Sequence, residues 1–144
     1  MAVAGLLAAA HAGMAAGEGG TAEEAQAMLE RAAAVVADEA AALAAFHAGS
    51  DGFKDRDLYV AGHDASDGMV TAHGADPTMV GRNIHDLTDA AGKRFGDEIQ
   101  AVATEGELRV VEYLWPRPGG SEAVPKETFV TKAASQVCVV GYYP

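Results

Sequence analysis

The sequence contains very little cysteine and few basic residues, and each shortage excludes some classes of protein. Its single cysteine, Cys138, excludes an intrachain disulfide and any metal or haem site of the CxxC type. Ten Lys and Arg stand against 21 Asp and Glu, which gives a net charge of −11 at pH 7. So acidic a chain is poorly suited to bind nucleic acid or an anionic membrane surface. A basic residue close to a pocket is therefore conspicuous.

Several catalytic and nucleotide-binding motifs are also missing. No serine lies in a nucleophile-elbow context, and Cys138 lies in the apolar run 137–140, where we expect a small buried hydrophobe. The glycines at 17–20 follow no predicted strand, so they do not form a phosphate-binding loop. No histidine pair has the i,i+4 spacing of a zinc-peptidase helix. The sequence therefore favours a protein that is not an enzyme and needs no cofactor or metal.

The 144 residues suffice for one domain with its own core, preceded by a distinct N-terminal segment. Residues 1–16 are small and apolar, and they resemble the h-region and cleavage site of a secretory signal, although no Lys or Arg precedes Arg31. We expect residues 1–20 to be a signal peptide or its remnant with a flexible end, and the protein to be periplasmic or secreted. The alternative is an alanine-rich N-terminal helix. The segment is too short to span a membrane.

The pattern of apolar residues predicts an α+β fold. Thr21 and Glu24 form a capping box, and apolar residues at three- and four-residue steps as far as Phe46 predict one long helix over about 22–47. Strands are expected over 58–61, 69–72, 108–115, 126–131 and 137–142. The predicted fold is a long N-terminal helix packed on an antiparallel sheet of about five strands. Short helices lie between the second and third strands.

The segment 57–95 is the most specific part of the chain. A predicted hairpin around the turn at 64–68 leads directly into His-Gly, Asp-Pro and Gly-Arg-Asn. Together with GTAEEAQAML before it, and with VEYLWPRP, VPKETFV and VVGYY after it, this order of motifs resembles a single Cache domain. Cache domains are PAS-like extracytoplasmic sensor modules of bacterial receptors. The resemblance covers residues 20–143 and is nearest to free-standing periplasmic single-Cache proteins, so we expect a Cache domain over residues 21–144.

The resemblance implies a function in sensing. It implies binding of a small organic carboxylate such as acetate, propionate or pyruvate, by a domain that signals through a separate partner such as a chemotaxis receptor or a histidine kinase. The chain departs from the family pattern at Ala61-Gly62-His63, where two bulky apolar residues are usual. We expect this change to enlarge or polarise the ligand cavity.

A small carboxylate needs cationic or N–H donors in a mostly dry cleft with aromatic walls. Six residues are predicted to contact such a ligand: Tyr59, His73, Arg82, Tyr113, Trp115 and Lys126. Lys126, His73 and Tyr113 are the predicted donors, while Tyr59 and Trp115 are the predicted walls. Arg82 has a competing structural role, in which it pairs with Asp86 or Asp89.

The other predicted contacts have structural alternatives too. His73 and the three aromatic residues also suit the core, and Lys126 also suits a solvated strand start. We interpret His63 and His85 as surface or turn residues, and His47 as a residue that interacts with the helix end.

Two other functions remain open. The first is a small metal-dependent enzyme, for which the chain offers a dense set of ligands to Zn, Fe or Mn: His63, Asp64, His73, Asp76, His85, Asp86 and Asp89. Several of these aspartates also suit turns. The second is a structural module that forms a homodimer through the long helix.

Overall fold

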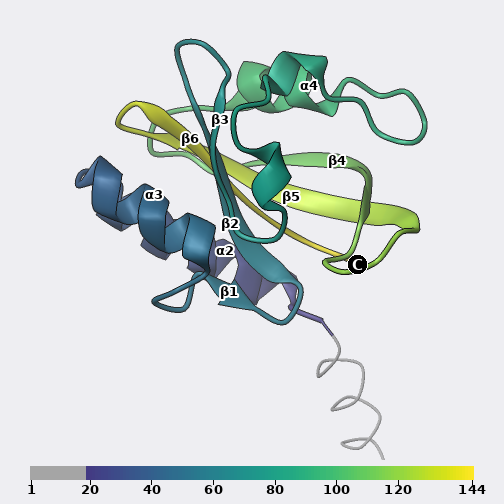
Figure 1. Ribbon diagram of the computed structural model, residues 1–144, viewed down its shortest axis with the longest axis horizontal. Helices are drawn as coiled ribbons and strands as arrows, with labels where there is room; N and C mark the ends of the chain where they lie inside the picture. Colours follow the sequence, from purple (N-terminus) through teal and green to yellow (C-terminus); the bar gives the residue numbers. More distant parts are fainter. Residues whose placement is uncertain (1–18) are drawn as a thin grey trace, which may run out of the picture.

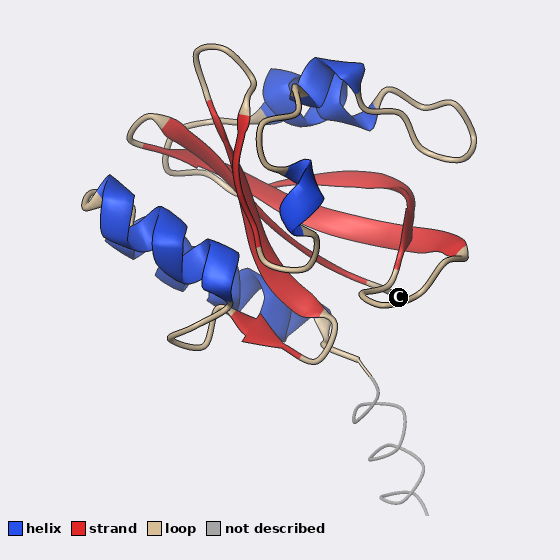
Figure 2. Ribbon diagram, viewed as in Figure 1, coloured by secondary structure: helices blue, strands red, loops and turns tan. Residues whose placement is uncertain are grey.

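The computed structural model describes residues 19–144, so most of the predicted signal segment lies outside the described residues. The described chain begins with two helices, α2 (Ala22–Val35) and α3 (Glu39–Ala48). Six strands follow: β1 (Lys54–Asp55), β2 (Leu58–Asp64), β3 (Val70–His73), β4 (Arg109–Pro116), β5 (Ala123–Ala133) and β6 (Gln136–Tyr142). Between β3 and β4 lie three short helices: η1 (Pro77–Met79), η2 (Ile84–Asp86) and α4 (Phe95–Val102), all drawn in Figure 2.

The strands form one antiparallel sheet with a helical layer on each face. The order of the strands is β1-β2-β6-β5-β4, and β3 pairs with β2. Helix α2 lies over β5 and β6, whereas α3 lies over β2 and β3 (Figure 1). The short helices cover the opposite face of the sheet. The predicted α+β fold is confirmed, including the short helices after the hairpin, with the two-residue strand β1 as an addition.

The N-terminal helices differ from the prediction in being two rather than one. The capping box is present, with the Glu24 backbone N–H donating to Thr21 Oγ1 at 3.1 Å. The helix ends at Val35, however, in a pair of β-branched valines that favour helix only weakly. A straight helix over 22–47, about 40 Å long, would run along one line, whereas the break lets α3 cover β2 and β3. The predicted homodimer therefore loses the single long helix on which it was based.

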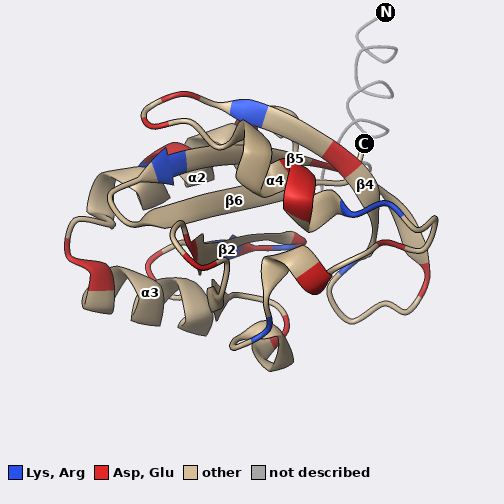
Figure 3. Ribbon diagram, turned by 90° about the horizontal axis from the view of Figure 1, so that it is seen from above, with Lys and Arg blue, Asp and Glu red and all other residues tan. Residues whose placement is uncertain are grey.

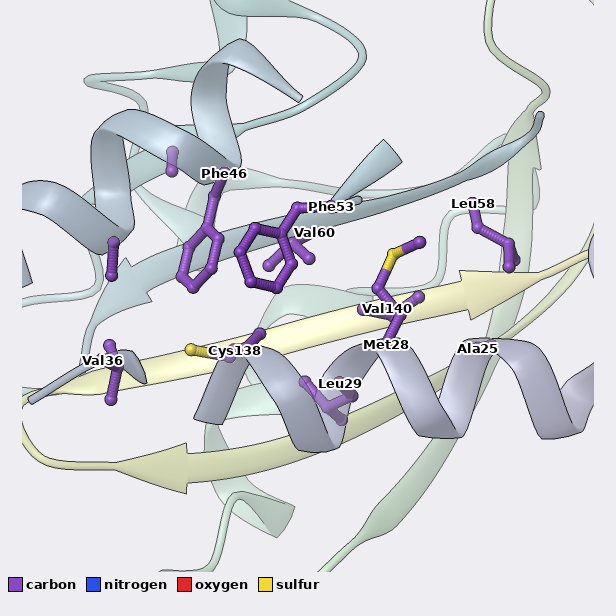
Figure 4. Close-up of a cluster of buried hydrophobic side chains, with 13 residues drawn as sticks. Ala25, Met28, Leu29, Val36, Phe46, Phe53, Leu58, Val60, Cys138 and Val140 are labelled. Atoms are coloured by element: carbon purple, nitrogen blue, oxygen red, sulfur yellow. The ribbon is translucent and has the colours of Figure 1, made fainter. Parts of the chain in front are cut away.

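The core on the helix side combines both helices with alternate residues of β2 and β6. Cys138 lies in this core and is fully buried, and burial raises the pKa of its thiol to about 12, as expected for a small hydrophobe. Phe46 and Phe53 meet edge to face with ring centroids 4.9 Å apart. Figure 4 shows these side chains together with Ala25, Met28, Leu29, Val36, Leu58, Val60 and Val140.

Charged groups lie mainly outside this core. Acidic residues are scattered over the helices and loops, where they outnumber basic ones (Figure 3). Within residues 19–144, no helix has both the length and the apolar character needed to cross a membrane.

A buried carboxylate ties the start of α2 to the sheet. Asp57 precedes β2, is buried, and accepts a hydrogen bond from the Gly20 backbone N–H at 2.7 Å. The neighbouring Arg56 donates to the Gly19 carbonyl at 3.0 Å and to Glu24 at 2.8 Å. The chain before the first helix is thereby held against the edge of the sheet.

We expect Asp57→Ala to lower the free energy of unfolding by about 1–3 kcal/mol, because it leaves the Gly20 N–H buried without an acceptor. The matched control is Asp55→Ala, which removes an exposed ion pair with Arg56 and should change stability by less than about 1 kcal/mol. Urea denaturation of the two variants checks this. Equal effects would contradict the role assigned to Asp57.

Candidate ligand-binding site

A small cavity lies between the sheet and the short-helix layer. Its volume is about 50 Å³, which exceeds the roughly 10–15 Å³ that a cavity needs to hold one water, so it suits a small ligand. The sheet contributes Tyr59, Ala61, Gly62, His63, Val70, His73, Tyr113, Trp115, Lys126, Val139 and Gly141. The short-helix layer contributes Met79, Ile84, Leu87, Phe95 and Ile99. Five of the six predicted ligand-binding residues thus line one cavity.

The hairpin delivers its polar side chains through an irregularity in β3. Along β2, Tyr59, Ala61 and His63 alternate onto the cavity face. Ala61 pairs with His73, Gly62 with Ala72 and His63 with Val70, so Thr71 is the extra residue of a bulge. Val70 and His73, three residues apart, can therefore both line the cavity. Thr71 itself donates to Gln136 at 2.7 Å.

Lys126 is a buried cation without an anionic partner among residues 19–144. Its side chain comes from β5, and the residue is only 4% exposed. The ammonium donates to the Tyr59 hydroxyl at 2.9 Å and lies 4.4 Å from the Tyr59 ring centroid and 5.2 Å from that of Tyr143. In the described part of the chain, no carboxylate lies within 4 Å of it. An ammonium has three donors, so Lys126 can bind further partners besides Tyr59.

Gly141 provides the space that Lys126 occupies. It lies on β6, the neighbour of β5, and lines the cavity. A Cβ at this position would clash with Lys126 Cε and Thr128 Oγ1. The lysine stem can cross β6 here only because residue 141 has no side chain.

His73 is a neutral donor. Its Nδ1 accepts hydrogen bonds from the backbone N–H groups of Asp76 at 2.8 Å and Ala75 at 3.2 Å. Because both partners are donors, the ring hydrogen is on Nε2. Burial, together with the positive charge of Lys126, lowers the pKa of His73 to about 4, so the ring is uncharged at neutral pH. His47 lies in the last turn of α3, as predicted, and it also accepts from the His73 backbone N–H at 3.4 Å.

Aromatic side chains form one wall of the cavity. Tyr113 and Trp115 lie on the same side of β4, as their spacing predicts. Phe95, from the start of α4, stacks on Tyr113 at 4.1 Å with an angle of 10° between the rings, and meets Trp115 at 5.2 Å. Thr128 Oγ1 bonds the Tyr113 hydroxyl at 3.0 Å. The wall is thus rigid and largely apolar.

Arg82 is the predicted site residue that the structure leaves outside the cavity. It is exposed, and its guanidinium lies 3.5 Å from Met79 Sδ. Within the described residues it forms no ion pair with Asp86 or Asp89, so the predicted pairing is wrong. Asp89 does brace its loop, by accepting from the backbone N–H groups of Ala91, Lys93 and Leu114, each at 2.9 Å.

His63 is the polar residue of the cavity that the sequence analysis placed wrongly. Its predicted place at the surface or in a turn is contradicted, because it is 1% exposed and lines the cavity. The alternation from Tyr59 through Ala61 is the signal that would have found it. His85, in contrast, is a surface residue that pairs with Asp97 at 2.7 Å.

The His and Asp residues considered as metal ligands are dispersed. Asp64 accepts from Ser66 and Asp76 from Thr78, each within its own turn. Over residues 19–144, no three His, Cys, Asp or Glu side chains are grouped so that they could hold a metal ion. The candidate site is therefore a small cavity with one cation, two neutral histidines and an aromatic wall.

Comparison with known proteins places this fold and cavity in a family. The Single Cache domain 2 family matches residues 16–142, and the chain belongs to it. The family consists of sensory domains rather than enzymes. The predicted membership of the single Cache family is confirmed.

The chain also resembles individual chemoreceptors. It is 30% identical over 76 residues to the methyl-accepting chemotaxis protein McpP of Pseudomonas putida, a match that covers 53% of this chain but only 14% of that protein. A periplasmic sensor domain of a chemotaxis protein is 30% identical, with a TM-score of 0.62 over 84% of this chain and 88% of that one.

Two further solved structures share the fold. A methyl-accepting chemotaxis protein of Vibrio parahaemolyticus has a TM-score of 0.69 at 20% identity, covering 84% of this chain and 86% of that one. A Cache chemosensory domain studied for its recognition of carboxylic acid has a TM-score of 0.63 at 21% identity, covering 81% and 84%.

We expect His73 to remain neutral down to a pH of about 4, and Lys126→Met to raise its pKa by removing a nearby positive charge. In the unfolded chain His73 takes up a proton near its ordinary pKa of about 6.5, so the free energy of unfolding should fall as pH falls from about 6.5 to about 4. Titration of the imidazole proton resonances by NMR measures the pKa of His73 in the wild type and in Lys126→Met. A His73 that titrates near 6.5 in the wild type would contradict this assignment.

Proposed function

We propose that this Cache domain binds a small organic monocarboxylate, of the acetate, propionate or pyruvate class, as an extracytoplasmic sensor. The observation that carries the proposal is the buried ammonium of Lys126, which lacks an anionic partner among the described residues. A charge removed from water is unfavourable unless it is paired. A ligand carboxylate in the cavity supplies that charge and accepts hydrogen bonds from the lysine.

The rest of the cavity suits the same ligand. The Nε2–H of His73 is a neutral donor, and the Tyr59 oxygen accepts from Lys126, which leaves its own O–H hydrogen free to donate. Tyr113, Trp115 and Phe95 exclude water and accommodate a short alkyl group. The small volume of the cavity, about 50 Å³, favours a small acid over a large one.

The relatives support a proposal on where the protein acts and with which component. They include periplasmic sensor domains and methyl-accepting chemotaxis proteins, and one of them was studied for carboxylic acid recognition. We assign this chain a periplasmic or secreted location, with a receptor, histidine kinase or transport protein as the component that responds to the bound acid.

Lys126→Met tests the proposal on binding and on stability. Calorimetric titration with acetate, propionate and pyruvate should show affinity roughly 10- to 100-fold weaker than that of the wild type, the effect of losing charge-assisted hydrogen bonds. The ligand-free variant should be as stable as the wild type or more stable by about 1 kcal/mol, because a buried unpaired charge has been removed. Thermal unfolding with and without acid measures both effects.

Lys132→Met is the matched control. Lys132 is on the same strand but pairs with the exposed Glu105 at 3.3 Å, so its loss should leave acid binding unchanged. Failure of the wild type to bind any of the three acids would refute the proposal. Equal binding by the wild type and Lys126→Met would show that Lys126 has no role in acid binding.

A further inference from the structure

The edge strand β4 leaves part of one face of the sheet uncovered. On this face α3 lies over β2 and β3, and α2 lies over β5 and β6, whereas β4 lies beyond both helices. Because Tyr113 and Trp115 line the cavity, the even-numbered residues of β4 face the helix side. A third helix beside α2 would complete this layer. The place for it, which we call the β4 face, carries Leu108, Val110, Glu112 and Leu114 of β4 and Glu127 and Phe129 of β5.

The β4 face is apolar toward the start of β4. Val110 is 47% exposed, the highest value among the large hydrophobic side chains of residues 19–144. It pairs across the sheet with Phe129, which is only partly buried and stacks on Tyr142 with the ring centroids 6.0 Å apart. Leu108, two residues before Val110, is also only partly buried. An apolar strip at the edge of a sheet is typical of an interaction surface.

The other end of the β4 face is acidic. Glu112 and Glu127 lie directly opposite each other, an arrangement in which like charges are destabilising. Within the described chain neither forms an ion pair. Tyr142 donates to Glu127 at 2.6 Å, and this bond, together with burial and the charges of Glu127, Glu23 and Glu112, raises the pKa of the Tyr142 hydroxyl to about 12. Three carboxylates thus lie near one end of the apolar strip.

A hollow of about 280 Å³ lies at this acidic end. Its lining includes Glu112, Leu114, Pro125, Glu127 and Pro144. Two lysines also border it, but both are engaged elsewhere. Lys93 pairs with Glu98 at 3.0 Å, and the ammonium of Lys126 bonds Tyr59 on the cavity side of the sheet. A hollow with apolar walls and two carboxylates without ion pairs suits the apolar stem and charged end of a lysine or arginine.

We infer that the β4 face binds a basic amphipathic helix of a partner protein, which lies beside α2 and along β4. The strand from Leu108 to Leu114 is about 20 Å long at roughly 3.3 Å per residue, the length of about 13 helical residues. Apolar side chains of the partner helix cover Val110 and Phe129. A lysine or arginine near one of its ends enters the hollow.

The charge of this surface argues against a second copy of the chain as the occupant. Helix α2 exposes Glu23, Glu24 and Glu30, and its one basic residue, Arg31, is bonded to the carbonyls of residues 51 and 52. An α2 helix from another copy would therefore place carboxylates against carboxylates. The net charge of −11 opposes self-association in the same way. A helix that carries Lys or Arg has the complementary charge.

A synthetic helix is the probe that tests this inference. It is a 14-residue alanine-based peptide with leucines along one side and lysines in its first and last turns, and its counterpart has glutamates in place of the lysines. Fluorescence anisotropy should show binding of the basic peptide and at least tenfold weaker binding of the acidic one. Added salt should weaken the binding. In ¹H–¹⁵N NMR spectra the basic peptide should shift resonances of the β4 face.

Matched variants locate the binding. Val110→Asp should weaken it about tenfold or more, whereas Val80→Asp, at a valine that is 40% exposed after η1, should leave it unchanged. Glu112→Gln and Glu127→Gln should each weaken it about three- to tenfold, while Glu122→Gln, in the exposed loop after β4, should have no effect. Glu112→Gln removes a repulsion and should melt no lower than the wild type, so that its weaker binding cannot be attributed to unfolding.

Several outcomes would overturn the inference. They are no binding of the basic peptide, resonance shifts confined to another surface, and equal binding by the wild type and Val110→Asp. Sedimentation that shows a wild-type dimer dissociated by Val110→Asp would identify a second copy as the occupant, and would overturn it as well. None of these measurements involves an acid in the cavity, so the proposed function is tested separately.

Discussion

The burial of the Lys126 ammonium against aromatic rings, without a carboxylate beside it, is the interaction on which the site depends. Tyr59 accepts one of its hydrogen bonds, and Gly141 leaves room for its stem. Cation–π contacts with Tyr59 and Tyr143 offset only part of the desolvation, since each is worth about 0.5–2 kcal/mol against several kcal/mol for a buried ion. Under the proposed function, an acid that neutralises this charge relieves the remaining cost, and the difference favours its binding.

The two faces of the sheet differ in character: one carries the main apolar core and the other carries the cavity. The face under α2 and α3 is entirely apolar at its centre, with Phe46, Leu58 and Val140 packed without polar partners. The opposite face places Lys126, His63 and His73 among aromatic side chains. Because β2 alternates strictly, Val60 can serve the first face while Tyr59 and Ala61 serve the second. Substitutions on the cavity side can thus alter the ligand without weakening the main core.

Local patterns in the sequence predicted most of this arrangement. The five longer strands, the capping box at Thr21 and the common face of Tyr113 and Trp115 all follow from alternation and from residue preferences. The break after Val35 did not, because the apolar periodicity continues through it and the weak helix preference of two valines does not by itself end a helix. The alternation of β2 places His63 on the cavity face, but its hydrogen bond with Gln100, thirty-seven residues away, could not be predicted from the sequence. The prediction that Arg82 lines the cavity also depended on tertiary context. Its backbone pairs with Val70, while its side chain is exposed to solvent.

Trp115 has a consequence of a different kind. It is the only tryptophan of the chain, and it lies in the wall of the cavity against Phe95 and Tyr113. Indole emission depends on the polarity around the ring, so replacement of cavity water by an acid changes the environment of a single chromophore. Under the proposed function the protein therefore contains its own optical reporter, through which binding of an acid can be followed without a label.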